Sequence, residues 1–157
     1  MKTNIGRQMA SLICAAGLLG AAPALAESAV NTGYFGDVAI MGYHTVAYFT
    51  DGQATKGSPE IVHEWMGATW HFAKPEHRDA FAAQPIGYAP QYGGYCSAGV
   101  VNGEVTSNID PEAWSIVDGK LYLNYSKPVR EEWEQNSEKM IAGADAKWPE
   151  VEAKLTQ

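Results

Sequence analysis

Five residues beyond the N-terminal segment could hold a metal ion or carry out thiol chemistry. Cys96 follows two adjacent glycines in the segment Tyr88–Ser97, which reads YAPQYGGYCS, and all four histidines lie between positions 44 and 77. A thiolate together with imidazole nitrogens suits Cu(I), Cu(II) or Zn²⁺. These residues do not have the spacing of a metal-binding motif, so they can form one site only if the fold brings them together.

Cys96 is the single cysteine of the expected mature chain, so it cannot form an intramolecular disulfide. It could be a buried apolar side chain, a metal thiolate, a redox thiol, a nucleophile or half of an intermolecular bridge. The Gly93-Gly94 pair before it suits a tight turn or a close backbone approach. We predict a metal site built from Cys96 with His44 as its nearest partner, and with His77 and His63 as further candidate ligands.

Residues 1–26 have the pattern of a secretory signal peptide, which is removed from the mature protein. Two cations precede the apolar run Met9–Ala22, and Ala24-Leu25-Ala26 is a small-x-small cleavage site. The sequence therefore predicts cleavage after Ala26 and a periplasmic or secreted protein. Residues 27–157 are expected to form one domain with a C-terminal helical extension.

The net negative charge of the chain disfavours polyanionic binding partners. Removal of Lys2 and Arg7 with the signal peptide takes the formal charge from −7 to −9. An acidic protein is a poor ligand for nucleic acid or anionic membranes. The remaining chain has no stretch of 18 apolar residues, so we expect no stable membrane insertion.

The sequence pattern predicts the helices and strands that must position these side chains. We expect them to form a small α+β domain with antiparallel hairpins, a short helix after the first hairpin and a C-terminal helical segment. No internal repeat is visible. The apolar, β-forming run Ala39–Thr50 predicts a strand, and Asp110–Glu112 predicts the start of a short helix. The remaining elements are a hairpin over Ile61–Phe72, a helix over Pro75–Gln84, loop and short strand over Gly99–Ser107, a hairpin over Ser115–Tyr125 with an Asp118-Gly119 turn, and a helix over Ser126–Trp148 that Gly143 divides and Pro149 ends.

The first hairpin and the helix after it decide which histidines face inward. A turn at Gly67-Ala68 would pair Trp65 with Trp70 and His63 with Phe72, which places these four side chains on one face. Glu64 and His71 would share the opposite, exposed face. His77 and Phe81 are four residues apart on the helix, so His77 should lean toward the core with Phe81.

Four segments resemble motifs of the exported branch of the YHS-domain family. The segment GYHTVAYF at Gly42–Phe49 is similar to the GYDPVAYF segment of that branch, with His44 in place of a common acidic residue. The other three are YAPQYGGYC at Tyr88–Cys96, DPEAW at Asp110–Trp114 and DGKLYLNY at Asp118–Tyr125. The resemblance covers nearly all of the mature chain and implies a small α+β domain with a metal-binding role.

The resemblance does not carry the thiolate site of the metal-associated members over to this chain. Their first cysteine position falls on Ala47, and the two positions at the start of their helix fall on Ala73 and His77. Two sulfur ligands are thus absent and a histidine takes the third position. The resemblance therefore supports His77 as a ligand, whereas Cys96 belongs to the motif of the exported branch itself.

Three functions remain open from the sequence. The first is an exported protein that binds a transition metal, with copper favoured and zinc possible. The second is an enzyme with Cys96 as nucleophile and a histidine as base, although no common catalytic motif is present. The third is a module without metal that binds a small ligand or a protein through its five tryptophans and eight tyrosines. The sequence favours a protein that is not an enzyme and names no protein partner.

Overall fold

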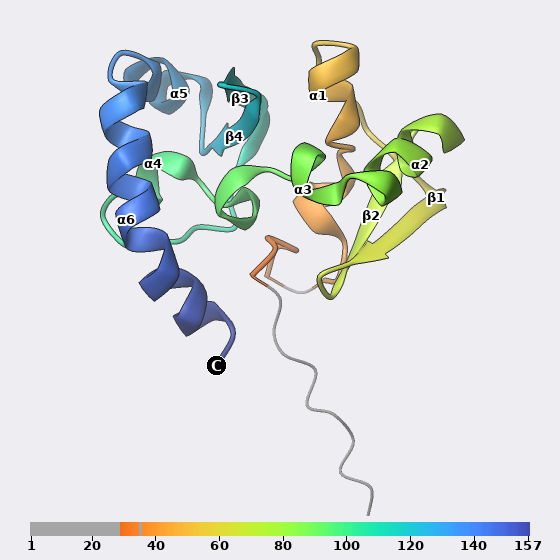
Figure 1. The fold of residues 1–157 in the computed structure, drawn as a ribbon, viewed down its shortest axis with the longest axis horizontal. Helices are drawn as coiled ribbons and strands as arrows, with labels where there is room; N and C mark the ends of the chain where they lie inside the picture. The colour runs from red at the N-terminus through yellow and green to blue at the C-terminus, as the bar shows by residue number, and fades with distance from the viewer. Residues whose placement is uncertain (1–28, 35) are drawn as a thin grey trace, which may run out of the picture.

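Two β-hairpins, each preceded by short helical turns and followed by a helix, make up most of a single α+β domain, which confirms the predicted fold class (Figure 1). The computed structural model describes residues 29–34 and 36–157, so the predicted signal peptide lies outside the described residues. The strands are β1 (Ser58–Trp65), β2 (Ala68–Phe72), β3 (Asp110–Val117) and β4 (Lys120–Asn124). The helical elements are η1 (Ala39–Gly42), α1 (Val46–Thr50), α2 (Pro75–Ala83), α3 (Pro85–Tyr88), η2 (Gln91–Gly94), α4 (Ser97–Val100), α5 (Lys127–Glu134) and α6 (Ser137–Leu155).

The backbone arrangement from η1 to α2 is repeated from η2 to α5, although no repeat is visible in the sequence. We call Ala39–Ala83 the first repeat and Gln91–Glu134 the second repeat. Both strands of the second hairpin start 52 residues after their counterparts, as the pair Ser58 and Asp110 shows. Both hairpins also have a register irregularity at the same place, after the first residue of the leading strand.

Backbone details of the two repeats also correspond. The N–H of Tyr43 donates to the carbonyl of Ile40 at 3.0 Å, and the N–H of Tyr95 donates to that of Tyr92 at 3.0 Å. The side chains differ so much that only short matches such as Gly42-Tyr43 with Gly94-Tyr95 remain in the sequence. The shared backbone is therefore visible only in the structure.

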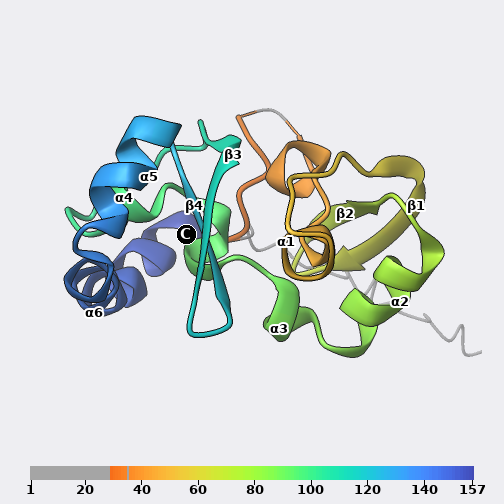
Figure 2. The same cartoon turned by 90° about the horizontal axis from the view of Figure 1, so that it is seen from above.

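The second hairpin lies at the centre of the domain, between the first repeat and α6. Figures 1 and 2 show the first repeat on one side and α4, α5 and α6 on the other. Leu121 and Leu123 of β4 belong to a core cluster with Trp70, Phe72 and Phe81, whereas Tyr122 on the opposite face packs with Trp133. None of the described helices, including the 19-residue α6, is long and apolar enough to cross a membrane.

The first hairpin has the predicted faces but a different turn. Trp65 pairs with Ala68 and His63 with Trp70, so the turn is Met66-Gly67 rather than Gly67-Ala68. Both turn residues have positive φ, which is the conformation of a type I′ turn. A turn shifted by one residue moves each pairing by two positions, so Trp65, Trp70, His63 and Phe72 still share one face. The second hairpin turns at Asp118-Gly119 as predicted.

The predicted strand over Ala39–Thr50 is wrong. The chain forms η1 and the single helical turn α1 there, and Ile40, Met41 and Gly42 all have positive φ. Val46, Ala47 and Tyr48 are all buried in α1. A run of consecutive apolar residues is therefore compatible with a buried helical turn as well as with a buried strand. An apolar run of this length does not by itself distinguish the two.

Three further boundaries also differ from the predictions. Asp110–Glu112 begins strand β3 rather than a helix, and Pro111 lies in the irregular part of the pairing, where a strand tolerates proline. The C-terminal helix divides at Gln135-Asn136 instead of Gly143, and it continues through Pro149 to residues that are covered, since Val151 is buried and Leu155 packs against the second core cluster. The segment Gly99–Ser107 completes α4 and contains no strand. The helix predicted over Pro75–Gln84 is confirmed as α2.

Candidate metal site at His44 and His77

The structure brings two of the four predicted ligands together. His44 lies between η1 and α1, where its backbone N–H donates to the carbonyl of Thr55 at 3.0 Å. His77 lies in the first turn of α2, a helix that starts at Pro75. The ring centres of His44 and His77 are 5.2 Å apart, and the ring planes are inclined by 48°. Thus His77 leans inward as predicted, and its ring lies beside that of His44.

Three ring nitrogens of this pair are buried without a hydrogen-bond partner among the described residues. They are Nδ1 and Nε2 of His44 and Nδ1 of His77. The side chain of His44 is only 1% exposed, and its other aromatic neighbour is Phe72, with ring centres 6.2 Å apart. Buried polar groups in proteins nearly always have a partner, so an unpartnered set points to a bound water or ion.

Burial is the main cause that lowers the pKa of His44 from 6.5 to about 4, and the adjacent His77 contributes to this shift in the same direction. Asp51 opposes this shift, but burial is the larger cause because it disfavours the charged imidazolium. His44 is therefore a neutral imidazole at pH 7. Neutral imidazole is the form that binds metal ions.

Asp51 lies close enough to influence both histidines, but its carboxylate has other partners. It accepts a hydrogen bond from the hydroxyl of Thr50 at 2.9 Å, and its other oxygen is 3.5 Å from the ammonium of Lys74. The Thr50 hydrogen bond is the main reason why the pKa of Asp51 lies below its ordinary value. Asp51 thus serves as an anionic neighbour of the histidine pair.

Cys96 lies away from this pair, in the second repeat. Its side chain is 4% exposed, and Sγ accepts a hydrogen bond from the backbone N–H of Tyr125 at 3.3 Å. Sγ also lies 3.9 Å from Oδ1 of Asn124, in position to donate its S–H. Within the described residues, no three His, Cys, Asp or Glu side chains are grouped so that they could hold a metal ion. Cys96, His44 and His77 therefore do not form one cluster.

The other two histidines are separate from the pair as well. His63 is half-buried and its ring meets Phe81, with centres 6.0 Å apart. His71 lies on the opposite face of the hairpin as predicted, but it is half-buried rather than exposed, and it pairs with Val62 instead of Glu64. Of the predicted ligands, only His44 and His77 are brought into ring contact.

The glycines before Cys96 serve backbone packing, as their pattern predicts. A Cβ on Gly93 would lie 1.8 Å from the carbonyl oxygen of Ala29, and Asn31 donates its backbone N–H to the carbonyl of Gly93 at 2.8 Å. A Cβ on Gly94 would meet the side chain of Ile40 at 2.2 Å. The pair therefore holds the segment before the first repeat against η2, and it does not expose the thiol of Cys96.

The closeness of His44 and His77 could not be found from spacing alone. The first precedes a helical turn and the second opens a helix beyond the whole first hairpin. Two features of the sequence pointed to His77, namely its spacing from Phe81 and the resemblance that places a ligand position on it, but neither joined it to His44. Comparison of the chain with protein-family models, with curated proteins and with solved structures gave no match.

Proposed function

We propose that this chain is an exported protein that binds a transition-metal ion, with copper favoured, through His44 and His77. The observation that carries the proposal is the set of three buried ring nitrogens without a partner among the described residues. The resemblance to exported YHS-domain proteins points in the same direction. Cys96 stands outside the proposed site because its sulfur is buried with Tyr125 and Asn124.

The spacing of the two rings fits one ion between them. With metal–nitrogen bonds of about 2.0–2.1 Å, two imidazoles that bind one ion at a tetrahedral angle have ring centres about 5 Å apart. The measured separation of 5.2 Å agrees with this value. The neutral state of His44 adds to the fit because no proton has to be displaced from it at pH 7.

Copper is favoured over zinc because the chain offers few ligands at this place. Structural zinc sites take four protein ligands and catalytic zinc sites take three. The histidine pair supplies two, and no third acidic, cysteine or histidine side chain of the described residues completes a metal-binding group. Copper binds imidazole more tightly than other divalent first-row metals do, and the bent arrangement of the two rings would leave its remaining coordination positions to water.

The burial of Cys96 speaks against the alternative of a cysteine-nucleophile enzyme. A catalytic thiolate needs an electropositive and partly exposed environment. Cys96 is 4% exposed and no lysine, arginine or histidine is among its hydrogen-bond partners. A thiol reagent is therefore expected to label Cys96 only after the protein is unfolded.

Export rests on the predicted signal peptide. Intact-mass analysis of the protein from the periplasm or medium is expected to show Glu27 as the first residue. Exported protein that retains Met1 would contradict cleavage after Ala26.

The copper site is tested with tag-free protein of residues 27–157 and a competing Cu(I) chelator of known affinity. Loss of an outer-shell partner alone costs about 10–100-fold in metal affinity, so loss of a ligand in His44→Ala or His77→Ala should cost at least about 100-fold. His71→Ala and Cys96→Ser are the controls and should bind as the wild type does. Circular dichroism checks that each variant is folded.

Two outcomes would overturn the proposal. If Cys96→Ser loses copper and His77→Ala keeps it, the thiolate is the ligand and the histidine pair is not. If folded wild-type protein binds neither copper nor zinc in the competition assay, the pair holds no metal.

A further inference from the structure

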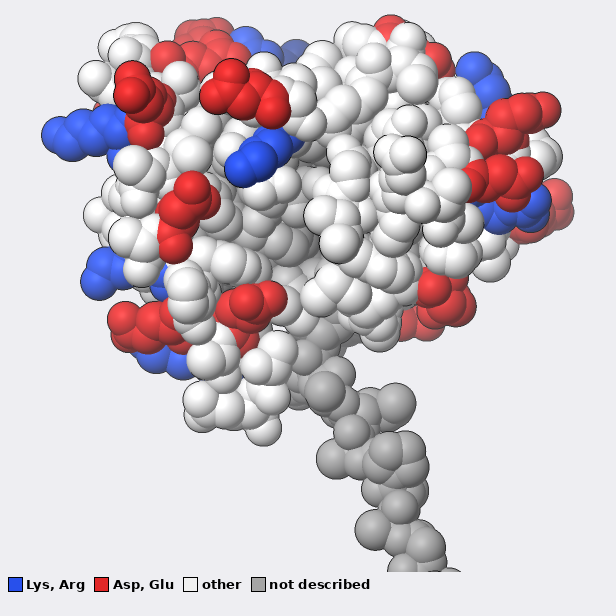
Figure 3. Space-filling view, viewed as in Figure 1, with Lys and Arg blue, Asp and Glu red and all other residues white. Residues whose placement is uncertain are grey.

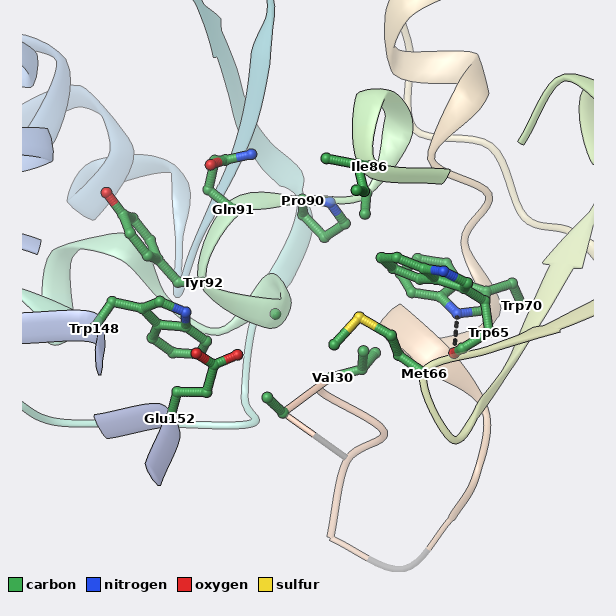
Figure 4. Close-up of a pocket in the computed structure, with 13 residues that line it drawn as sticks. Val30, Trp65, Met66, Trp70, Ile86, Pro90, Gln91, Tyr92, Trp148 and Glu152 are labelled. Carbon is green, nitrogen blue, oxygen red and sulfur yellow. Dashed lines mark hydrogen bonds between the residues drawn. The ribbon is translucent and has the colours of Figure 1, made fainter. Parts of the chain in front are cut away.

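A second candidate site, separate from the histidine pair, lies between the first hairpin and α6. It is a cavity of about 170 Å³ whose walls come from distant parts of the chain (Figure 4). Trp65, Met66 and Trp70 of the first hairpin form one wall, and Trp148 and Glu152 of α6 form the opposite wall. Figure 3 shows that this middle part of the face carries few charged side chains, which gather toward its edges.

The walls present aromatic faces on more than one side. Trp65 and Trp148 are half-buried and line the cavity together with Tyr92 from η2. The rings of Trp65 and Trp70 are in contact, with centres 5.8 Å apart. The rings of Tyr92 and Trp148 are also in contact, with centres 5.7 Å apart. The two ring pairs therefore supply aromatic surface from two separate parts of the cavity lining. The negative faces of tryptophan and tyrosine rings attract cations, tryptophan most strongly.

Among the described residues that line the cavity, Glu152 is the one with a charged side chain. It is half-buried, and no cationic side chain of the described residues forms an ion pair with it. Glu150, on the solvent side of the same helix, instead pairs with Lys154 at 2.8 Å. A half-buried carboxylate at an aromatic wall lacks a counter-ion that a bound cation would supply.

We propose that this cavity binds a small organic cation with alkylated nitrogen, such as a trimethylammonium group. The aromatic faces would contact the methyl groups and the diffuse positive charge, and Glu152 would balance that charge. Most of the lining is aromatic or aliphatic, which suits methyl groups on the nitrogen better than the three N–H donors of a primary ammonium. A neutral apolar ligand would cover Glu152 without pairing it, which is unfavourable.

The size of the cavity limits the ligand to a small headgroup. Pockets for drug-sized ligands have volumes of about 300–1,000 Å³. The cavity here has about 170 Å³ and opens to solvent, so it can enclose the alkylated nitrogen while the rest of the ligand extends outward.

The proposal is tested by binding of choline and of its neutral carbon isostere, 3,3-dimethylbutan-1-ol, to metal-free, tag-free protein. The readout is the indole N–H signals of the tryptophans in NMR spectra, because three of the five tryptophans line the cavity. Choline is expected to shift these three signals, and the neutral isostere should bind at least about tenfold more weakly, given the usual strength of a desolvated cation–π contact.

Matched variants locate the charge and the aromatic wall. Glu152→Gln keeps the shape of the side chain and should weaken choline binding about tenfold, since it removes one charge-balancing contact. Glu150→Gln, two residues away on the solvent side, should bind choline as the wild type does. Trp148→Leu removes an aromatic face and should also weaken binding, with its thermal unfolding recorded as a check on the fold.

Several results would overturn the proposal. Equal affinity for choline and the neutral isostere would mean that the cavity selects apolar shape only. If Glu152→Gln and Glu150→Gln weaken choline binding equally, the cation is attracted by the acidic surface as a whole and not by the cavity. Absence of any shift of the cavity tryptophans at millimolar choline in a folded protein would exclude this class of ligand. None of these results depends on copper binding, so the two proposals fail separately.

Discussion

The two repeats hold different side chains at the same backbone position. His44 in the first repeat and Cys96 in the second are counterparts, since each follows a Gly-Tyr pair with the same backbone turn. His44 faces His77 and has no hydrogen bond to its ring nitrogens from the described residues. The counterpart of His77 is Val129, and Cys96 is instead satisfied by Tyr125 and Asn124. The same backbone turn therefore buries the side chain that follows it in both repeats. The residues packed around that side chain decide whether its nitrogen or sulfur atoms are hydrogen-bonded or remain available to bind a metal ion.

The two hairpins also differ in how completely their second strands are buried. Strand β2 alternates between buried and half-buried residues, whereas β4 has four consecutive buried residues from Leu121 to Asn124. β4 is covered by the first repeat on one face and by Trp133 and its neighbours on the other. The second repeat thus acts as the structural centre, and the first repeat carries the unpartnered polar groups of the candidate metal site.

The largest expected effect comes from the aromatic pair that both repeats share. Trp70 and Phe81 have ring centres 4.8 Å apart, and their counterparts Tyr122 and Trp133 have centres 5.1 Å apart. Phe81 and Trp133 are both almost fully buried. We expect Phe81→Ala and Trp133→Ala each to lower the free energy of unfolding by about 3–5 kcal/mol, as truncation of a buried aromatic does.

Urea unfolding of the two variants measures this loss. Tyr125→Ala, at a residue that is 51% exposed, is the control and should change the free energy by no more than about 0.5 kcal/mol. A loss below about 1 kcal/mol in one of the two core variants would show that its repeat does not depend on the shared aromatic pair.

The sequence predicted well those elements that have a local signal. The Asp118-Gly119 turn and the Pro75-started helix are examples, because turn and capping preferences depend on neighbouring residues. The shared face of Trp65, Trp70 and Phe72 also followed from alternation, and it survived an error of one residue in the turn. The shared core of these residues with Phe81 is confirmed, although Val46 joins it from a helical turn and not from a strand.

The remaining features depend on contacts between distant segments. The apolar run that contains Val46 satisfies a buried helical turn as well as a strand, so only its environment decides between them. The approach of His44 to His77 requires the whole first hairpin to fold back between them. Likewise, the cavity between Trp65 and Trp148 joins segments more than half of the mature chain apart, and no local pattern signals it.

An intermediate effect should appear at acid pH and distinguishes His44 from Cys96. Burial lowers the pKa of His44 from 6.5 in the unfolded chain to about 4 in the folded protein. The unfolded state then binds more protons below pH 6.5, so stability is lost as the pH falls from about 6.5 to about 4. The full shift corresponds to about 3 kcal/mol.

The measurement is the free energy of unfolding of metal-free protein at pH 7 and at pH 4. We expect His44→Leu to lose about 3 kcal/mol less than the wild type between these two pH values. Cys96→Ala should keep the pH dependence of the wild type. Equal losses for the wild type and His44→Leu would mean that the folded protein accommodates a charged His44.

The smallest effect concerns the turns of the two hairpins. Met66 and Asp118 are counterparts and both have a φ of 50°, in the left-handed region. This region costs about 1–2 kcal/mol for an ordinary side chain, whereas asparagine and aspartate tolerate it through local hydrogen bonds. We therefore expect Met66→Asn to raise the free energy of unfolding by about 0.5–1 kcal/mol, and Asp118→Asn to change it by no more than about 0.5 kcal/mol.

The side chain of Met66 opposes this gain, because it lines the cavity beside Trp65 while remaining 50% exposed. Its removal loses only part of an apolar contact, so relief of backbone strain should dominate. If Met66→Asn instead destabilises the protein, the thioether contributes more to the cavity wall than the turn costs the backbone. Choline titration of Met66→Asn tests that explanation, because a wall that depends on Met66 would then bind the cation more weakly than in the wild type.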